Sequence, residues 1–195
     1  MKDAGSICFG LLAGGKSSRM GTDKASLLWR DKPLWQHQLR LGTEMGASEV
    51  LISGKMDGPY GATAKVIPDE SPEAGPLAGI AALLGVMKSD WLVLVAVDMP
   101  FVEADDLKIL LECRTETCGV VPRLNGRVEP LAAIYPRSLA PLTRQQVASA
   151  DRSLQAFVRA AQSAGLITLL EWPIEKARAL RSLNSPKEWA DALKT

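Results

Sequence analysis

Residues 91–97 form an unbroken run of seven apolar residues, which lies between Asp90 and Asp98. Strands of a parallel sheet are covered by helices on both faces, so their sequences are continuously apolar and do not alternate. A run this short, ended by a carboxylate and by Pro100, is typical of a buried central strand. The chain is therefore expected to fold around a parallel sheet, with Asp98 at the point where this strand leaves the core.

Strand and helix patterns alternate through most of the chain, which favours an α/β fold: a three-layer α/β/α sandwich around a mainly parallel, mixed sheet. Further strands are predicted at residues 7–12, 49–53, 65–68, 119–122, 131–135 and 167–170. Helices are predicted at residues 34–45, 76–87, 103–113, 138–148, 153–164 and 186–193. With 195 residues, of which 47% are hydrophobic, the chain is expected to form one domain, residues 1–195.

The composition narrows the class of protein. The formal net charge is +1, so neither nucleic acid nor an anionic membrane is expected as a partner. Three cysteines, without a C-x-x-C pair, indicate free thiols in a reducing compartment. No signal peptide or long apolar segment is found, so a cytoplasmic protein is expected. The one histidine, His37, makes a His-rich metal site or a histidine base improbable.

Residues 10–24 combine four glycines with three cations directly after the first predicted strand. Gly10, Gly15, Lys16 and Ser17 satisfy the G-x4-G-K-[ST] pattern of a P-loop. However, residues 11–13 are apolar and read better as strand, and a helix begun at Lys16 would soon meet a glycine, which costs about 1 kcal/mol against alanine. A long anion-binding loop is therefore favoured, with the P-loop of a GTPase or kinase as the alternative.

The same loop carries the motifs of a known family. The sequence Leu12-Ala13-Gly14-Gly15, followed by Arg19-Met20-Gly21 and Asp23-Lys24, resembles the signature of nucleotidyltransferases related to molybdenum cofactor guanylyltransferase. The resemblance extends over most of the chain and implies a Rossmann-like fold of the nucleotide-diphospho-sugar transferase type. It also implies an enzyme that binds Mg-GTP, transfers GMP to the phosphate of molybdenum-molybdopterin and releases pyrophosphate.

By this resemblance three side chains act in catalysis: Lys24, Arg19 and Asp98. Lys24 would neutralise phosphate charge in the transition state, and Arg19 offers a planar fork for two phosphate oxygens. Asp98 suits a magnesium ion that bridges phosphate oxygens. The cradle is expected from Leu12 and from the backbone amides of residues 13–15, since Gly14 and Gly15 allow close approach of a phosphate.

Three further positions match weaker family motifs, and a fourth departs from its motif. Asp69 resembles the aspartate that contacts the nucleoside, and residues 75–79, beginning at Gly75, resemble the segment against the purine, which favours GTP over CTP. Ser53 stands where the family usually has an asparagine, so its ribose contact is open. Asn184 resembles an asparagine that holds the acceptor or metal-bound phosphates, although Asn184 or Ser185 is equally suited to cap the helix that begins near residue 186.

The resemblance implies that residues 1–118 bind the nucleotide and that residues 119–195 bind the acceptor. Arg123, Arg127 and Arg152 are candidates for gripping the acceptor phosphate, with solvated surface arginines as the alternative. A transient contact with insertion or recipient proteins is implied by the family alone. The alternatives for the whole chain are a CTP-using molybdopterin cytidylyltransferase, a sugar-phosphate nucleotidyltransferase and a non-catalytic nucleotide-binding accessory protein.

Overall fold

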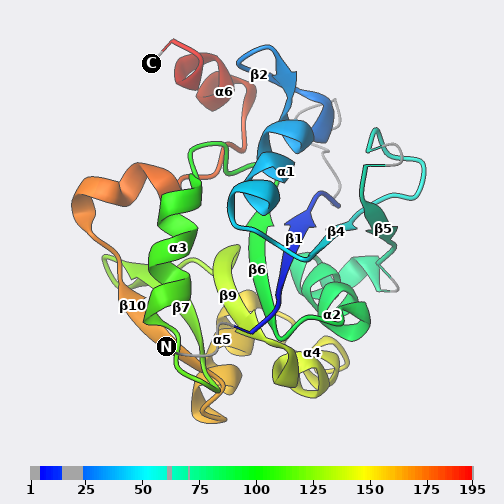
Figure 1. Ribbon diagram of the computed structural model, residues 1–195, viewed down its shortest axis with the longest axis vertical. Helices are drawn as coiled ribbons and strands as arrows, with labels where there is room; N and C mark the ends of the chain where they lie inside the picture. The colour runs from blue at the N-terminus through cyan, green and yellow to red at the C-terminus, as the bar shows by residue number, and fades with distance from the viewer. Residues whose placement is uncertain (1–4, 15–23, 61–62, 70, 195) are drawn as a thin grey trace.

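A computed structural model describes residues 5–14, 24–60, 63–69 and 71–194, and the statements below concern these residues (Figure 1). An eight-stranded sheet has the order β10-β7-β9-β6-β1-β4-β5, with β8 paired to β7. Its strands are β1 (Ile7–Leu12), β4 (Glu49–Ser53), β5 (Lys65–Ile67), β6 (Trp91–Ala96), β7 (Gly119–Leu124), β8 (Arg127–Val128), β9 (Ala132–Pro136) and β10 (Ile167–Glu171). A small separate hairpin consists of β2 (Leu28–Trp29) and β3 (Lys32–Pro33).

The sheet is mixed, as the alternating patterns predicted. β1 pairs in parallel with β4 and β6, and β5 continues this parallel half beyond β4. β9 is antiparallel to both β6 and β7, whereas β10 runs parallel to β7. The parallel half therefore presents several strand ends at one edge, and β9 reverses the direction next to the central strand β6.

Helices cover both faces of the sheet, which confirms the three-layer sandwich. α1 (Leu34–Glu44) and α3 (Ala104–Cys113) lie on the face toward the viewer in Figure 1, and α2 (Pro76–Val86), α4 (Ala140–Val147) and α5 (Leu154–Ser163) lie behind it. α6 (Pro186–Ala192) lies at the upper end, beside the β2–β3 hairpin. No helix in the described ranges has the length and apolar character needed to cross a bilayer.

The core explains why β1 contains a glycine. All six residues of β6 are buried, and Gly10 faces it so closely that an added Cβ would lie 2.6 Å from a methyl group of Leu92. Gly10 is thus a packing residue inside a strand that continues to Leu12. A P-loop needs its strand to end before the first glycine, so the P-loop alternative is wrong.

Three elements differ from the predictions. The helix expected from residue 138 begins at Ala140, after a 3-10 turn (Arg137–Leu139), because Pro141 is tolerated only in a first helical turn. The loop expected at residues 123–130 is a hairpin of β7 and β8, which turns through Asn125 and Gly126 with φ of 50° and 77°. The 3-10 helix η4 (Ile174–Leu180) was not predicted, since it has no strong helical periodicity.

Candidate functional site

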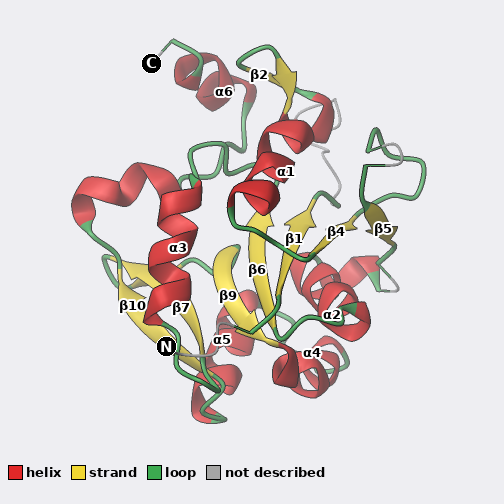
Figure 2. Cartoon of the chain, viewed as in Figure 1, coloured by secondary structure: helices red, strands yellow, loops and turns green. Residues whose placement is uncertain are grey.

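The parallel strands β1, β4 and β6 end at one edge of the sheet, where ligands of open α/β sheets bind. Their arrowheads point toward the same upper edge in Figure 2. Backbone hydrogen bonds tie the segments that leave this edge: the Val97 amide donates to the Leu12 carbonyl at 2.9 Å, and the Ala13 and Gly14 amides donate to the Ser53 carbonyl at 2.8 and 3.0 Å. The edge is therefore a joined group of segments and not a set of independent loops.

Lys24, Asp98 and Asn184 meet at this edge. The Lys24 ammonium lies 2.9 Å from Asp98 Oδ2 and donates to Asn184 Oδ1 at 2.8 Å. The side chains of Lys24 and Asp98 are only 19% and 18% exposed, so their attraction is partly sheltered from solvent. The Leu183 amide also donates to the Asp98 carbonyl at 2.8 Å, which brings the C-terminal segment to the end of β6. Three predicted residues from distant parts of the chain are thus placed together.

The oxygens around Lys24 fit a hard cation. Asp98 supplies a carboxylate and Asn184 an amide oxygen, and both already face the positive charge of one ammonium group. Mg2+ in nucleotide sites is usually held by one or two protein carboxylates together with substrate phosphates and water. Among the described residues, no group of three or more His, Cys, Asp or Glu is arranged so that it could hold a metal ion.

Glu129 is a second carboxylate near this edge that the sequence analysis did not select. Burial raises the pKa of Glu129 most, and the negative charge of Asp98 raises it further, against the opposing influence of the Leu131 amide and Arg127. The pairing of β6 with β9 places it there, since the Ala96 amide donates to the Leu131 carbonyl. In the sequence Glu129 lay within a charged segment, and the antiparallel return of β9 could not be predicted from that segment.

Asp69 lies at the end of β5, and a buried side chain orients it. The Ser53 hydroxyl, 1% exposed, donates to Asp69 Oδ1 at 2.6 Å. The other carboxylate oxygen approaches Gly14, where an added Cβ would lie 3.2 Å from it. The Ser53 hydroxyl therefore orients Asp69, and a contact of Ser53 with the ribose stays an open prediction.

The predicted phosphate cradle is only partly described. Arg19 and Gly15 lie outside the described residues, as do residues 15–23 as a whole. Leu12 is buried, and the amides of Ala13 and Gly14 are occupied by the Ser53 carbonyl. Phosphate contact through these two amides would require them to give up those hydrogen bonds, contrary to the simple cradle that the glycines predicted.

Of the predicted purine segment, only the first two residues reach the surface. Gly75 and Pro76 are exposed, whereas the remaining three residues of 75–79 are buried. Gly75 has φ of 62°, a left-handed conformation that favours glycine and begins α2. Gly79 instead serves packing, because an added Cβ would lie 2.6 Å from Ser53 Oγ. Gly75 and Pro76 are therefore the residues of this segment that are open to solvent.

Two of the three arginines expected to grip an acceptor face carboxylates. Arg123 is bound to Glu171 of the neighbouring strand β10, and Arg152 lies 3.6 Å from Glu73. Arg127 is exposed in β8. Two of the three positive charges are therefore already balanced by carboxylates on the surface.

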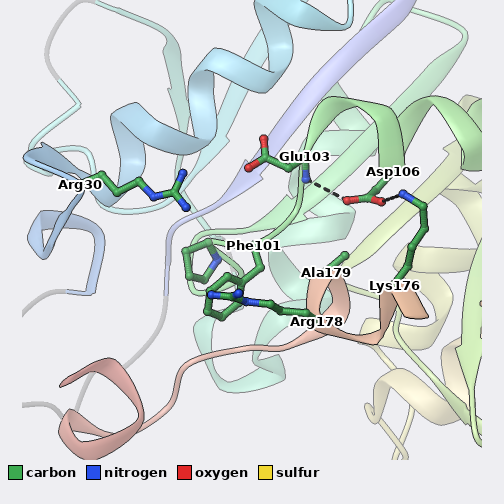
Figure 3. Close-up of a pocket in the computed structure, with 8 residues that line it drawn as sticks. Arg30, Phe101, Glu103, Asp106, Lys176, Arg178 and Ala179 are labelled. Carbon is green, nitrogen blue, oxygen red and sulfur yellow. Dashed lines mark hydrogen bonds and ion pairs between the residues drawn. The ribbon is translucent and has the colours of Figure 1, made fainter. Parts of the chain in front are cut away.

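A separate pocket of about 280 Å³ lies between the β2–β3 hairpin, the start of α3 and η4 (Figure 3). Its lining includes three cations and two carboxylates. Lys176 pairs with Asp106 at 2.7 Å, and the Arg178 guanidinium lies over the Phe101 ring, 4.4 Å from its centroid. These contacts join groups within the lining, so nothing in the pocket identifies a ligand.

Comparisons with known proteins agree with the geometry. The MobA-like NTP transferase domain matches residues 10–165. The chain is 35% identical over 193 residues to the probable molybdenum cofactor guanylyltransferase of Opitutus terrae, covering 95% of this chain and 94% of that one. It is 32% identical over 185 residues to the molybdenum cofactor guanylyltransferase of Pseudomonas putida, with coverage of 93% and 94%.

The fold also matches solved structures. The crystal structure of molybdopterin-guanine dinucleotide biosynthesis protein A from Archaeoglobus fulgidus superposes with a TM-score of 0.76 at 21% identity, covering 96% of this chain and 97% of that one. At this identity the match supports the fold, and the two sequence relatives carry the family assignment.

Proposed function

The chain belongs to the family of MobA-like NTP transferases, and on this premise we propose that it transfers GMP from GTP to the phosphate of molybdenum-molybdopterin. In this reaction an oxygen of the acceptor phosphate forms a bond to the α-phosphorus of GTP. The bond from the α-phosphorus to the oxygen shared with the β-phosphate breaks, and pyrophosphate leaves with that electron pair. The two full-length curated relatives support guanylyl transfer as the activity.

The observation that carries the proposal is the position of Lys24 between Asp98 and Asn184. Negative charge moves from the attacking phosphate toward the leaving pyrophosphate, so a fixed positive charge beside the α-phosphate lowers the barrier. Two hydrogen bonds hold the Lys24 ammonium at the strand edge before a nucleotide binds, which removes part of the cost of ordering a flexible side chain. Lys24 is therefore the main electrostatic catalyst of the proposed reaction.

Asp98 and Asn184 are the residues that would hold Mg2+. When bound, the ion would neutralise negative charge on phosphate oxygens of the nucleotide. Both residues now face Lys24, so they also keep its ammonium at the same edge. Arg19, whose placement lies outside the described residues, is proposed to bind phosphate oxygens on the basis of the family motif.

The reaction needs no histidine base. A phosphate monoester acceptor is already ionised near neutral pH, so no proton has to be removed before it attacks. This agrees with the buried position of His37, the one histidine of the chain. The catalytic task left to the protein is positioning and charge stabilisation.

The nucleoside is proposed to lie between Asp69 and the start of α2. The half-buried Asp69 carboxylate is oriented by Ser53, and Gly75 and Pro76 offer an exposed surface for a purine. The acceptor is proposed to bind over residues 119–195. Of the three candidate arginines, the exposed Arg127 supports such a site better than Arg123 and Arg152, which face carboxylates.

The product is proposed to pass to insertion or recipient proteins through transient contacts, in keeping with the activity named for the curated relatives. The three cysteines are free thiols, which supports a reducing compartment such as the cytoplasm as the place of this reaction.

A pyrophosphate-release assay tests the proposal directly. The purified chain is incubated with Mg2+ and molybdopterin-loaded acceptor, and GTP, CTP and ATP are compared in parallel. Release with GTP alone is expected. Release with CTP alone would transfer the protein to the cytidylyl branch and contradict the purine assignment at Gly75, whereas release of orthophosphate or no release with any nucleotide would contradict guanylyl transfer.

A further inference from the structure

Three consecutive carbonyl groups at the end of β6 are held by other parts of the chain. The Asp98 carbonyl accepts from the Leu183 amide at 2.8 Å. The Met99 carbonyl accepts from Gln38 Nε2 at 2.6 Å, and the Pro100 carbonyl lies 3.1 Å from His37 Nε2. We propose that His37 and Gln38 are positioning residues, which fix the direction of the Asp98 carboxylate by holding the second and third peptide groups after it, Met99–Pro100 and Pro100–Phe101.

The two side chains come from one buried part of α1. His37 is 7% exposed and Gln38 is fully buried, although both are polar. A buried polar side chain is costly unless it is hydrogen-bonded, so each is expected to serve a definite partner. Both partners are main-chain carbonyls next to Asp98, and neither is a side chain of the core. The helix α1 therefore acts as a rigid support for the segment that carries Asp98.

Gln38 is hard to explain by stability alone. Its Oε1 atom is buried without a hydrogen-bond partner in the described part of the chain, which is unfavourable. Its Nε2 donor is not needed to satisfy the Met99 carbonyl either, because that carbonyl also accepts from the Val102 amide at 3.3 Å. A methionine of similar shape would fill the same space without an unpaired oxygen. The Nε2 contact to Met99 is thus the feature that requires glutamine.

His37 makes the matching contact one residue further along. A carbonyl oxygen can only accept, so the geometry assigns the hydrogen of the contact to His37 Nε2. The neutral ring suffices for this donation. The ring also lies beside Trp29, with centroids 6.2 Å apart, which limits its rotation. His37 and Gln38 therefore hold adjacent peptide groups from one face of α1.

The consequence concerns the metal and phosphate edge. If the peptide groups of Met99 and Pro100 are no longer held, the segment that carries Asp98 can shift and turn its carboxylate away from Lys24 and Asn184, and the oxygens that would hold Mg2+ no longer converge. This inference rests on the proposed function for its catalytic meaning, but the geometry predicts an effect on cation binding as well. Groups that orient metal ligands through one intermediate contact typically change affinity or activity by 10- to 100-fold.

The decisive variant is Gln38→Met, with Gln36→Met as the matched control, since Gln36 is an exposed glutamine of the same helix. Gln38→Met is expected to lower kcat about tenfold with KM for GTP within about twofold, and to weaken Mn2+ binding to the GTP complex by a similar factor. The midpoint of thermal unfolding is expected to stay equal or to rise. Gln36→Met should change none of these quantities.

A second pair of variants tests His37. His37→Leu removes the donor, whereas the Nε2 of His37→Gln can occupy nearly the same position as the histidine nitrogen. His37→Leu is expected to reproduce the loss in kcat and Mn2+ affinity, and His37→Gln to recover both to within about threefold of wild type. If the role of His37 is only structural, the losses in kcat and in Mn2+ affinity should instead parallel a fall in the temperature of thermal unfolding.

The outcomes separate this inference from the proposed function. Unchanged kcat and Mn2+ affinity in Gln38→Met, or losses that only follow a lower unfolding temperature, would overturn the positioning role. A wild type that binds Mn2+ and GTP but releases no pyrophosphate would contradict the proposed function. The Mn2+ affinities of the Gln38 and His37 variants, measured by electron paramagnetic resonance, would then still decide the positioning role.

Discussion

Two regions of the sheet differ in how far their ion pairs are exposed to solvent: the carboxyl edge of β1, β4 and β6, and the outer strands β7, β8 and β10. At the first, Lys24 and Asp98 lie 2.9 Å apart with side chains 19% and 18% exposed. At the second, Arg123 and Glu171 pair across neighbouring strands but are 41% and 65% exposed. Exposed ion pairs contribute little to stability, because water and salt screen the attraction between the two charges. Charges sheltered from solvent interact more strongly, because the dielectric constant around them is lower. The difference is consistent with the proposal that catalysis takes place at the first region, and the predictions below test it.

The largest expected effect comes from Lys24→Ala, which removes the sheltered charge. Transfer of GMP is expected to fall by about 10²-fold or more, because a lost contact to transition-state charge typically costs this much. Pyrophosphate release under single-turnover conditions measures the loss. Lys32→Ala, at an exposed lysine of the β2–β3 hairpin, is the control. Transfer within about threefold of wild type would remove Lys24 from the catalytic role.

A smaller effect is expected from Asn184→Ala. Asn184 supplies one neutral oxygen to the Lys24 ammonium, and a hydrogen bond to a charged group is worth about 1.5–3 kcal/mol. A loss of roughly 10- to 100-fold in kcat/KM is therefore expected. The competing role was helix capping, and the structure gives that to Ser185, which accepts from the Glu188 amide.

Ser185→Ala is therefore the matched comparison for Asn184→Ala. It is expected to cost about 1 kcal/mol of unfolding free energy and little transfer activity. Chemical denaturation and initial rates, measured on both variants, separate the two roles. Equal transfer losses in the two would mean that Asn184 acts only through the fold of the C-terminal segment.

Arg123→Ala tests the other side of the comparison. Because Arg123 is exposed and paired with Glu171, its loss is expected to change KM for the acceptor less than about threefold and the unfolding free energy by less than about 1 kcal/mol. Steady-state kinetics with varied acceptor measure the first quantity. An increase of KM by tenfold or more would show that the outer strands bind the acceptor phosphate, as their sequence had suggested.

The smallest effect concerns pH. Burial lowers the pKa of His37 below its usual 6.5, the Pro100 carbonyl opposes this, and the charges of Arg40, Glu103 and Arg30 act less strongly. Below pH 6.5 the unfolded chain therefore takes up a proton before the folded one. The contribution of His37 to the free energy of unfolding is therefore fully present above pH 6.5, and it falls as the pH decreases toward the pKa of His37 in the folded chain.

Urea denaturation at pH 7.5 and 5.5 measures this contribution. Wild type is expected to lose more stability between these values than His37→Gln, which has no histidine to titrate. Equal losses in both proteins would show that the ring titrates alike in the folded and unfolded chains.

Much of the fold followed from local patterns. The apolar run of β6 and the short strand β1 were predicted closely, because a strand buried on both faces leaves a continuous apolar signature. η4 and the β2–β3 hairpin were missed. The hairpin turns through Arg30 and Asp31, with φ of 46° and 66°, and these residues carry none of the usual turn signal of Asn-Gly. Such local geometries are imposed by packing and leave little trace in the sequence.

The sequence by itself determined the chemistry of this protein: its sheet, its family motifs and the identity of Lys24, Asp98 and Asn184. The tertiary structure decided which groups meet, namely that Lys24 lies between the other two, that Ser53 supports Asp69, and that His37 and Gln38 hold the peptides after Asp98. The reason is physical. Strands and motifs are set by the order of residues along the chain, whereas contacts between distant segments depend on how helices and strands pack in space.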